Sequence, residues 1–193
     1  ALPLLYANSW GLAFPQWVLN ELDLWVMYIQ NANGGSGYDH PGAYVNVSKT
    51  GGLLLQFAAI GDDVSTARVQ AALGFIDSRW NTACNNTWYG NLNHPYAMWA
   101  VYKALEVYAL TDYVESGGED IMIGEDMPSA PGGFTIGQDW DPLVSLAGDW
   151  YSHYCDYLCV NQNPGDGSWN GYSYWTGALA GGWYINILNA RGA

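Results

Sequence analysis

One stretch of the sequence decides the fold, and it reads Tyr157-Leu158-Cys159-Val160-Asn161-Gln162-Asn163-Pro164-Gly165-Asp166-Gly167-Ser168-Trp169. An aromatic and an aliphatic residue at a helix end are followed by a glutamine and by a tight Gly-x-Trp turn. Two weaker copies precede it, at residues 28–38 and at residues 75–89, and neither keeps the glutamine. The chain therefore carries one strong motif and two partial ones.

The strong motif resembles the QW repeat of the terpene cyclase and protein prenyltransferase families, which are squalene cyclase-like alpha/alpha toroids. Its slots are filled by Tyr157, Leu158, Gln162, Gly167 and Trp169. The resemblance implies that the glutamine closes the C-terminal end of an outer helix, while the tryptophan packs on the start of the next inner helix. These five residues are thus expected to form a structural joint between helix pairs, with catalysis elsewhere.

A second similarity runs through the chain. The segment 40–43 with Val47 and Lys49 recurs without a gap as the segment 94–97 with Val101 and Lys103, and residues 50–53 recur as residues 176–179. Similarity at a fixed period indicates stacked units, each too small to bury its own apolar face.

Apolar residues at helical spacing predict an all-α protein. The expected helices cover about 16–31, 43–60, 64–80, 95–110, 142–161 and 172–189, with Asp63 as a cap and Pro95 in a first turn. Outer and inner helices then alternate in about three pairs, half of the six-pair barrel that the resemblance implies. We expect one domain over 1–193, with a loop insertion at about 112–140.

Composition sets the environment and excludes some partners. Charged residues make up 12% of the chain against about 25% in an average protein, and there are 11 Trp and 15 Tyr. A surface this poor in charge favours an extracellular or cell-surface location, or extensive cover by partners. The net charge of −13 argues against nucleic acid and anionic membranes. No apolar run reaches the ~20 residues of a membrane-spanning helix, so no membrane insertion is expected.

Two tripeptides match the N-glycosylation pattern, and an exported protein would make them meaningful. Asn85 falls in an expected loop, which suits modification, whereas Asn46 falls inside an expected helix. The three cysteines are an odd number, so at least one is unpaired or bonded to another chain.

Catalytic clusters of the similar families are missing from the sequence. Triterpene cyclases use an Asp-x-Asp-Asp acid, and the nearest remnants here are Asp139-Trp140-Asp141 and Asp62-Asp63, the latter explained by capping. The acidic residues of the insertion, Glu119, Asp120, Glu125 and Asp126, suit calcium or a solvated charge run. No cofactor is expected.

Metal ligands are a second open question. His153, Cys155 and Cys159 could hold a zinc ion of the prenyltransferase kind, but small buried residues on an amphipathic helix are the simpler interpretation. His40 and His94 are weak metal candidates because they recur at one spacing with Lys49 and Lys103. We interpret these four residues as duplicated turn and helix positions without a catalytic role.

Aromatic residues in loops offer a binding function. Trp and Tyr side chains can stack on sugar rings or interlock with another copy of the chain, and the candidates are Trp88, Tyr89, Trp140, Trp150, Tyr172 and Tyr174. The sequence thus favours a non-catalytic extracellular structural or binding module that forms homo-oligomers or filaments and could bind carbohydrate. The alternative is an isoprenoid cyclase-like enzyme or a carbohydrate-active toroid enzyme, a lyase or a glycosidase.

Overall fold

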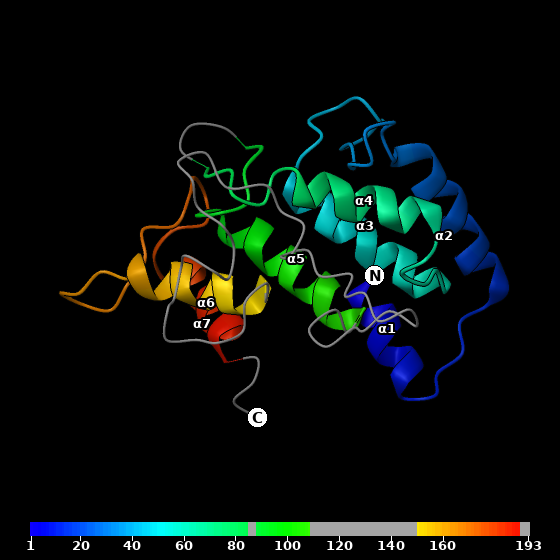
Figure 1. The fold of residues 1–193 in the computed structure, drawn as a ribbon. Coiled ribbons are helices and arrows are strands. Elements are labelled where there is room, and N and C mark those ends of the chain that lie inside the picture. The colour runs from blue at the N-terminus through cyan, green and yellow to red at the C-terminus, as the bar shows by residue number, and fades with distance from the viewer. Residues whose placement is uncertain (85–87, 109–149, 190–193) are drawn as a thin grey trace, which may run out of the picture.

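The structure is a computed structural model that describes residues 1–84, 88–108 and 150–189 (Figure 1). These ranges contain seven helices and no named strand, which confirms the all-α expectation. The helices are α1 (Leu2–Ser9), α2 (Gln16–Ile29), α3 (Val47–Ile60), α4 (Ala67–Asp77), α5 (Pro95–Val107), α6 (Trp150–Val160) and α7 (Gly177–Leu188). The expected insertion at about 112–140 lies outside the described residues, as does the 142–149 part of the fifth expected helix.

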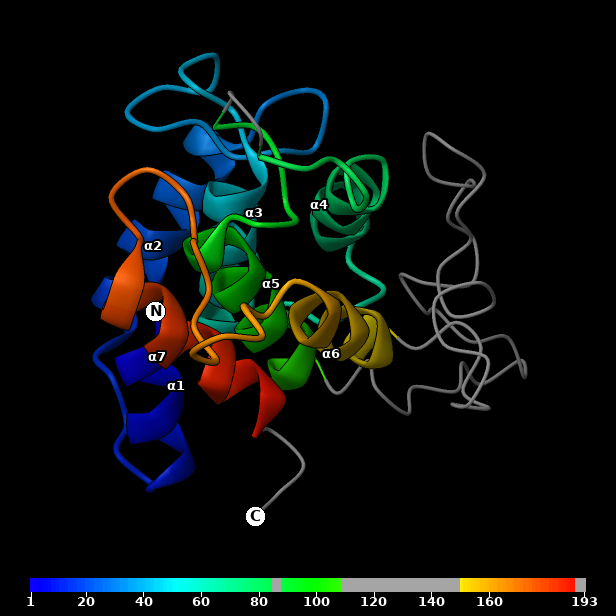
Figure 2. The ribbon, with the colours of Figure 1, turned by 90° about the vertical axis from the view of Figure 1, so that its left-hand side faces the viewer.

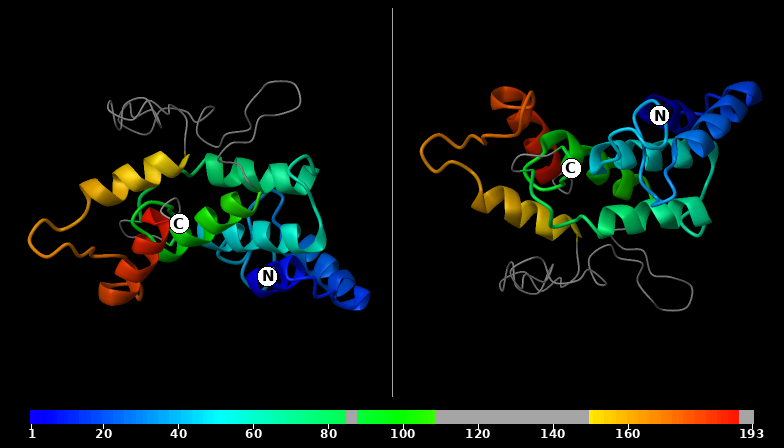
Figure 3. Two further views of the ribbon diagram at one scale, coloured as in Figure 1. Left: turned by 90° about the horizontal axis from the view of Figure 1, so that it is seen from below. Right: turned by 90° about the horizontal axis from the view of Figure 1, so that it is seen from above.

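Helices α3 and α5 form the centre of the molecule. They pack directly on each other, α3 also contacts α1, α2 and α4, and α5 contacts α7, which in turn contacts α6. Figures 2 and 3 show α4 and α6 on one side of the central pair and α1 and α2 on the other. Each successive helix of the series α3, α5, α7 thus packs on the previous one.

The close contact between α3 and α5 depends on small residues. A Cβ atom added at Gly51 of α3 would lie 2.8 Å from the backbone carbon of Ala100 in α5. Ala97, Ala100 and Ala104 are buried on α5, and Leu54 and Phe57 are fully buried on α3. The short side chains let the two backbones approach, and the large ones around them fill the remaining space at the density of a protein interior.

Several helix limits differ from the expected ones for local reasons. Helix α3 begins at Val47 and not at 43, because Tyr44 has a left-handed φ of 48° and Asn46 caps the helix by accepting from the Lys49 backbone N–H. Helix α7 begins at Gly177 and not at 172, because Tyr172 and Trp175 exchange two backbone hydrogen bonds of 3.0 Å. These turns are decided by contacts that hydrophobic spacing does not report.

Helix α1 was not expected, because its apolar residues are not confined to one face of so short a segment. Leu2 and Leu5 nevertheless pack against the core.

Asp63 was expected to cap the third helix, but α4 starts later, after Thr66. The Asp63 carboxylate instead accepts from the backbone N–H and hydroxyl of Ser65, at 2.9 and 2.6 Å, which makes it part of the preceding turn.

The sequence repeat does not match structurally equivalent positions. His94 is the N-cap of α5, whereas His40 lies in a turn well before α3, whose N-cap is Asn46. Likewise, Thr176 is the N-cap of α7, whereas Thr50 lies inside α3. The equivalent positions in the structure are therefore the N-caps Asn46, His94 and Thr176.

Trp80 connects α4 to α6. Its indole is fully buried, stacks on Tyr154 at 4.7 Å between ring centroids, and donates its Nε1–H to Nδ1 of His153. The Tyr154 hydroxyl donates to Asn91 at 2.6 Å, and the Asn91 amide donates to the Trp80 carbonyl at 3.0 Å. These three hydrogen bonds between buried groups join three segments of the chain.

Trp169 connects α6 to α7, and the contacts of the QW-like motif differ from those that the resemblance implies. The buried indole donates to the Leu158 carbonyl at 2.8 Å, so the tryptophan satisfies a carbonyl near the end of α6, and its ring packs edge-on against Tyr184 in α7 at 5.7 Å. Gln162 is exposed and donates to the Gly167 carbonyl at 2.8 Å, so its side chain bridges the loop. The carbonyl near the end of α6 is bonded by Trp169 and not by Gln162.

Substitution of the motif should therefore affect stability unequally. Trp169→Ala should lower the free energy of unfolding by roughly 3–5 kcal/mol, because a buried indole is lost. Gln162→Ala should lower it by less than about 1 kcal/mol, because its hydrogen bond is exposed to water. Urea unfolding followed by circular dichroism measures both, with Trp10→Ala, at a site that is 77% exposed, as the control. Equal effects of the two motif substitutions would contradict these roles.

Candidate aromatic binding pocket

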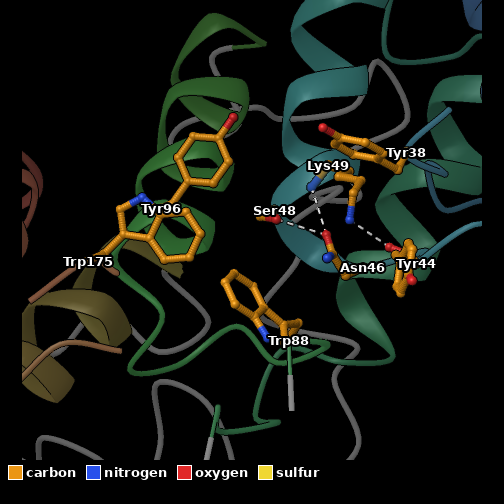
Figure 4. A pocket seen from close by; sticks show the side chains of 8 residues that line it. All are labelled: Tyr38, Tyr44, Asn46, Ser48, Lys49, Trp88, Tyr96 and Trp175. Carbon is orange, nitrogen blue, oxygen red and sulfur yellow. Dashed lines mark hydrogen bonds between the residues drawn. The ribbon is translucent and has the colours of Figure 1, made fainter. Parts of the chain in front are cut away.

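The start of α3, the start of α5 and the segment before α7 meet around a pocket of about 500 Å³. Figure 4 shows the eight residues that line it: Tyr38, Tyr44, Asn46, Ser48, Lys49, Trp88, Tyr96 and Trp175. Five of them are aromatic and one is a cation. The pocket lies at one end of the helix series because α3, α5 and α7 each place the residues at or just before their first turn beside it.

One wall of the pocket consists of stacked aromatic rings. Tyr96 and Trp175 lie nearly parallel, with centroids 5.7 Å apart and an angle of 12° between the rings. Trp88 meets Trp175 edge-on at 5.2 Å. The stack continues away from the pocket through Trp183, 5.5 Å from Tyr96, to Trp99. This wall is a preformed flat surface, held by contacts between α5 and α7.

The opposite wall carries the polar groups (Figure 4). The Asn46 side-chain oxygen accepts from the Ser48 hydroxyl at 2.8 Å and from the Lys49 backbone N–H at 3.0 Å, so it is committed to the helix cap. Nζ of Lys49 donates to the Tyr44 carbonyl at 2.7 Å and lies 5.7 Å from the centre of the Tyr38 ring. Partial burial lowers the pKa of the Lys49 ammonium below its ordinary value, because the charged form loses hydration.

His94 supports the aromatic wall. It is fully buried, its Nδ1 accepts from the Ala97 backbone N–H at 3.4 Å, and the rings of Trp88, Tyr172 and Trp175 lie 4.8–5.9 Å from it. Burial, and secondarily the charge of Lys49, lowers its pKa to about 4. The imidazole is therefore neutral near pH 7 and acts as a helix cap, and its proton is on the buried Nε2, for which the described residues provide no hydrogen-bond acceptor.

The two histidines proposed as weak metal candidates have different environments. His40 is exposed, and its Nδ1 accepts from the Gly42 backbone N–H at 3.3 Å. Lys103 pairs with Glu106 at 2.8 Å, whereas Lys49 lines the pocket. Within residues 1–84, 88–108 and 150–189, no three His, Cys, Asp or Glu side chains are grouped to hold a metal ion.

The cysteine candidates also diverge. Cys84 is buried, Cys155 is partly buried, Cys159 is exposed, and no disulfide joins any two of them. His153 is buried and accepts a hydrogen bond from Trp80, and among the described residues it does not form a metal-holding group with Cys155 and Cys159. Asp139, Asp141 and the acidic residues proposed for calcium lie outside the described residues.

The glycosylation candidates and the aromatic residues expected in loops lie in different environments. Asn46 is a buried cap, 2% exposed, and Asn85 lies outside the described residues. Trp88 lines the pocket, and Tyr172 and Tyr174 pack against it at 5.7 and 6.0 Å. Trp150 was expected in an exposed loop but is fully buried as the first residue of α6, and Trp140 is outside the described part of the chain.

Sequence reasoning missed Tyr38, Tyr44, Tyr96 and Trp175 as pocket residues. The available signal was their position: Tyr96 directly follows His94-Pro95 at the start of α5, and Trp175 directly precedes the N-cap of α7. Aromatic residues at equivalent ends of neighbouring helices lie side by side only if the helices have the same direction. The sequence does not reveal which helix ends are neighbours.

Comparison of the chain with protein-family models, with curated proteins and with solved structures finds no match. The similarity to QW-repeat proteins therefore rests on the motif residues themselves. None of the described helices has the length and apolar character that a membrane span requires. The function must be argued from the geometry of the pocket.

Acid should destabilise the protein through its buried histidines. The pKa of His94 is about 4 in the folded state against about 6.5 when unfolded, so unfolding takes up a proton between these values. Stability is full above pH 6.5 and falls as the pH drops towards 4, by roughly 2–4 kcal/mol from this residue.

The variant His94→Asn keeps an N-capping side chain and removes the titration. Urea midpoints between pH 7.5 and 4.5 should fall less steeply for this variant than for the parent chain. The matched control is His40→Asn, at an exposed site, which should keep the parent slope. A parent-like slope in His94→Asn would show that His94 does not contribute.

Proposed function

We propose that the chain is a non-catalytic extracellular or cell-surface binding module on a toroid-like helical repeat, and that the pocket binds carbohydrate. The observation that carries the proposal is that the aromatic wall of Tyr96 and Trp175 faces a polar wall. The pocket between the two walls has a volume of about 500 Å³. Aromatic faces stack on the C–H faces of sugar rings, while a few polar groups orient the hydroxyls. A drug-sized or disaccharide-sized ligand fits a pocket of this volume.

The toroid part of the proposal is supported by the order of packing. Helices α3, α5 and α7 contact one another in succession, and α2, α4 and α6 separate them in sequence. Trp169 also links α6 to α7, through its hydrogen bond to the Leu158 carbonyl and its ring contact with Tyr184, which supports the proposal although Gln162 does not close the helix end. We infer that α3, α5 and α7 are the inner helices of a partial toroid and that α2, α4 and α6 are its outer helices.

An enzymatic function has less support in the pocket itself. A glycosidase uses two carboxyl groups and a cyclase uses a strong acid, but the eight lining residues that the structure describes include no Asp or Glu. Asp62 instead forms an ion pair with Arg68, and Asp63 accepts hydrogen bonds from Ser65. An isoprenoid cyclase-like or carbohydrate-active enzyme remains the alternative, with its acid supplied from outside the described residues.

Sugar binding is tested with a glycan array followed by titration of the tryptophan fluorescence. We expect at least one oligosaccharide to bind, and Trp175→Ala to weaken it about tenfold or more, because the stacking face is lost. Trp175→Phe should be intermediate, and Tyr28→Ala, at an exposed site on α2, is the control. Binding of farnesol with no binding of any sugar would favour the isoprenoid alternative.

Self-association is the second part of the proposed function. Large apolar side chains are exposed on both ends of the helix series: Trp10, Trp17 and Met27 are 77%, 68% and 62% exposed, and Leu179 and Ile185 of α7 are 48% and 58% exposed. Terminal faces of stacked repeats need a cap or a partner. A head-to-tail contact between two such faces gives a ring or a filament.

Sedimentation velocity should therefore show homo-oligomers that grow with protein concentration and with moderate salt, since salt screens the net charge of −13. Ile185→Glu and Trp17→Glu should each weaken association. Val160→Glu, on α6 and outside the residues proposed for association, should not, although Val160 is 73% exposed. A monomer at high concentration in both low and moderate salt would contradict self-association.

A further inference from the structure

Lys49 makes the pocket positive in a chain that is otherwise strongly acidic. Among the eight described residues that line the pocket, Lys49 is the one with a charge, although the chain has only 5 basic residues against 18 acidic ones. An acidic protein repels anions at long range, so local charge decides whether an anion can bind. The charge that these eight residues bring to the pocket is opposite in sign to the net charge of the chain.

The ammonium of Lys49 has unused hydrogen-bonding capacity. Arg68 pairs with Asp23 and Asp62, and Lys103 pairs with Glu106. Lys49, by contrast, has no carboxylate within ion-pair distance in the described part of the chain, and its one hydrogen bond there goes to the Tyr44 carbonyl. An ammonium group has three donors. Two further N–H groups of the ammonium therefore have no acceptor among the described residues.

The surroundings of Lys49 strengthen the attraction between its ammonium group and an anionic ligand. Partial burial removes some hydration from the Lys49 ammonium and lowers its pKa, so an anion that enters the pocket meets a cation that is less hydrated than one on the open surface. Lys49 lies in the first turn of α3, where the helix dipole is also positive. The same features disfavour cationic ligands, which the aromatic rings alone would accept.

We propose that the ligand of this pocket is an acidic sugar, whose ring stacks on Trp175 and Tyr96 and whose carboxylate or sulfate group binds Nζ of Lys49. Figure 4 shows the geometry that supports it: the aromatic wall and Lys49 face each other across the cavity, with Trp88 between them on one side. A sugar ring that stacks on the aromatic wall would thus direct an equatorial acidic group towards Lys49 on the opposite wall. This inference rests on the proposed carbohydrate binding and specifies its chemical class.

The test compares ligands that differ only in charge. Oligogalacturonate is titrated against its fully methyl-esterified form, and a sulfated galactan oligosaccharide against its desulfated form, with tryptophan fluorescence as the readout. We expect one acidic member to bind about tenfold or more tightly than its neutral partner at low salt, and this ratio to shrink as salt rises. The pair that shows the preference distinguishes a carboxylate from a sulfate ligand.

Variants assign the preference to Lys49. Lys49→Gln should bring the acidic and neutral ligands to similar affinity, and Lys49→Arg should keep the preference. Lys103→Gln, which removes a lysine paired with Glu106 outside the pocket, is the matched control and should behave as the parent chain. Circular dichroism and the urea midpoint show whether each variant is folded.

The outcomes separate the two proposals. If neutral sugars bind as tightly as acidic ones, or if Lys49→Gln keeps the preference, the acidic-sugar inference is wrong while carbohydrate binding stands. If no sugar of either kind binds and the glycan array is also negative, the proposed function fails together with the inference.

Discussion

The close packing of α3 on α5 is the contact on which the rest of the structure depends. Gly51 allows it, because any side chain there would meet the backbone at Ala100. Helices α1, α2 and α4 then gather around α3, and α7 extends from α5. Since backbones in close contact hold their helices in a fixed relative position, the first turns of α3 and α5 are held beside each other. The pocket exists because of that arrangement.

Two tryptophans hold α6 in place from opposite ends. Trp80 stacks on Tyr154 and bonds to His153 near the start of α6, while Trp169 donates to the Leu158 carbonyl near its end. Each indole combines a large apolar surface with one N–H that needs a partner when buried. Such residues fix both the distance and the direction of a contact. This explains how a chain with few charges defines its helix–helix joints.

The pocket uses the same residue types for a different purpose. In the core, Trp80, Trp169 and Tyr154 donate hydrogen bonds and their rings are covered; at the pocket, Tyr38 and Tyr44 are about 70% exposed and Trp175 is only partly buried. Rigid, partly exposed rings lie there beside an ammonium that has no carboxylate partner among the described residues, so the site is organised before a ligand arrives, which lowers the entropic cost of binding. His94 contributes rigidity behind this wall by capping α5 in its neutral form.

The helical class and the approximate extent of α2 and α5 were determined by the sequence alone, because these depend on the local spacing of apolar residues. The sequence did not give α1, the late starts of α3 and α7, or the exchange of roles between Gln162 and Trp169, since turns and cross-chain hydrogen bonds decide them. The pocket was decided only by tertiary structure. Tyr44, Trp88, Tyr96 and Trp175 are distant in sequence, and they share a site because the starts of α3 and α5 and the segment before α7 come together at one end of the molecule.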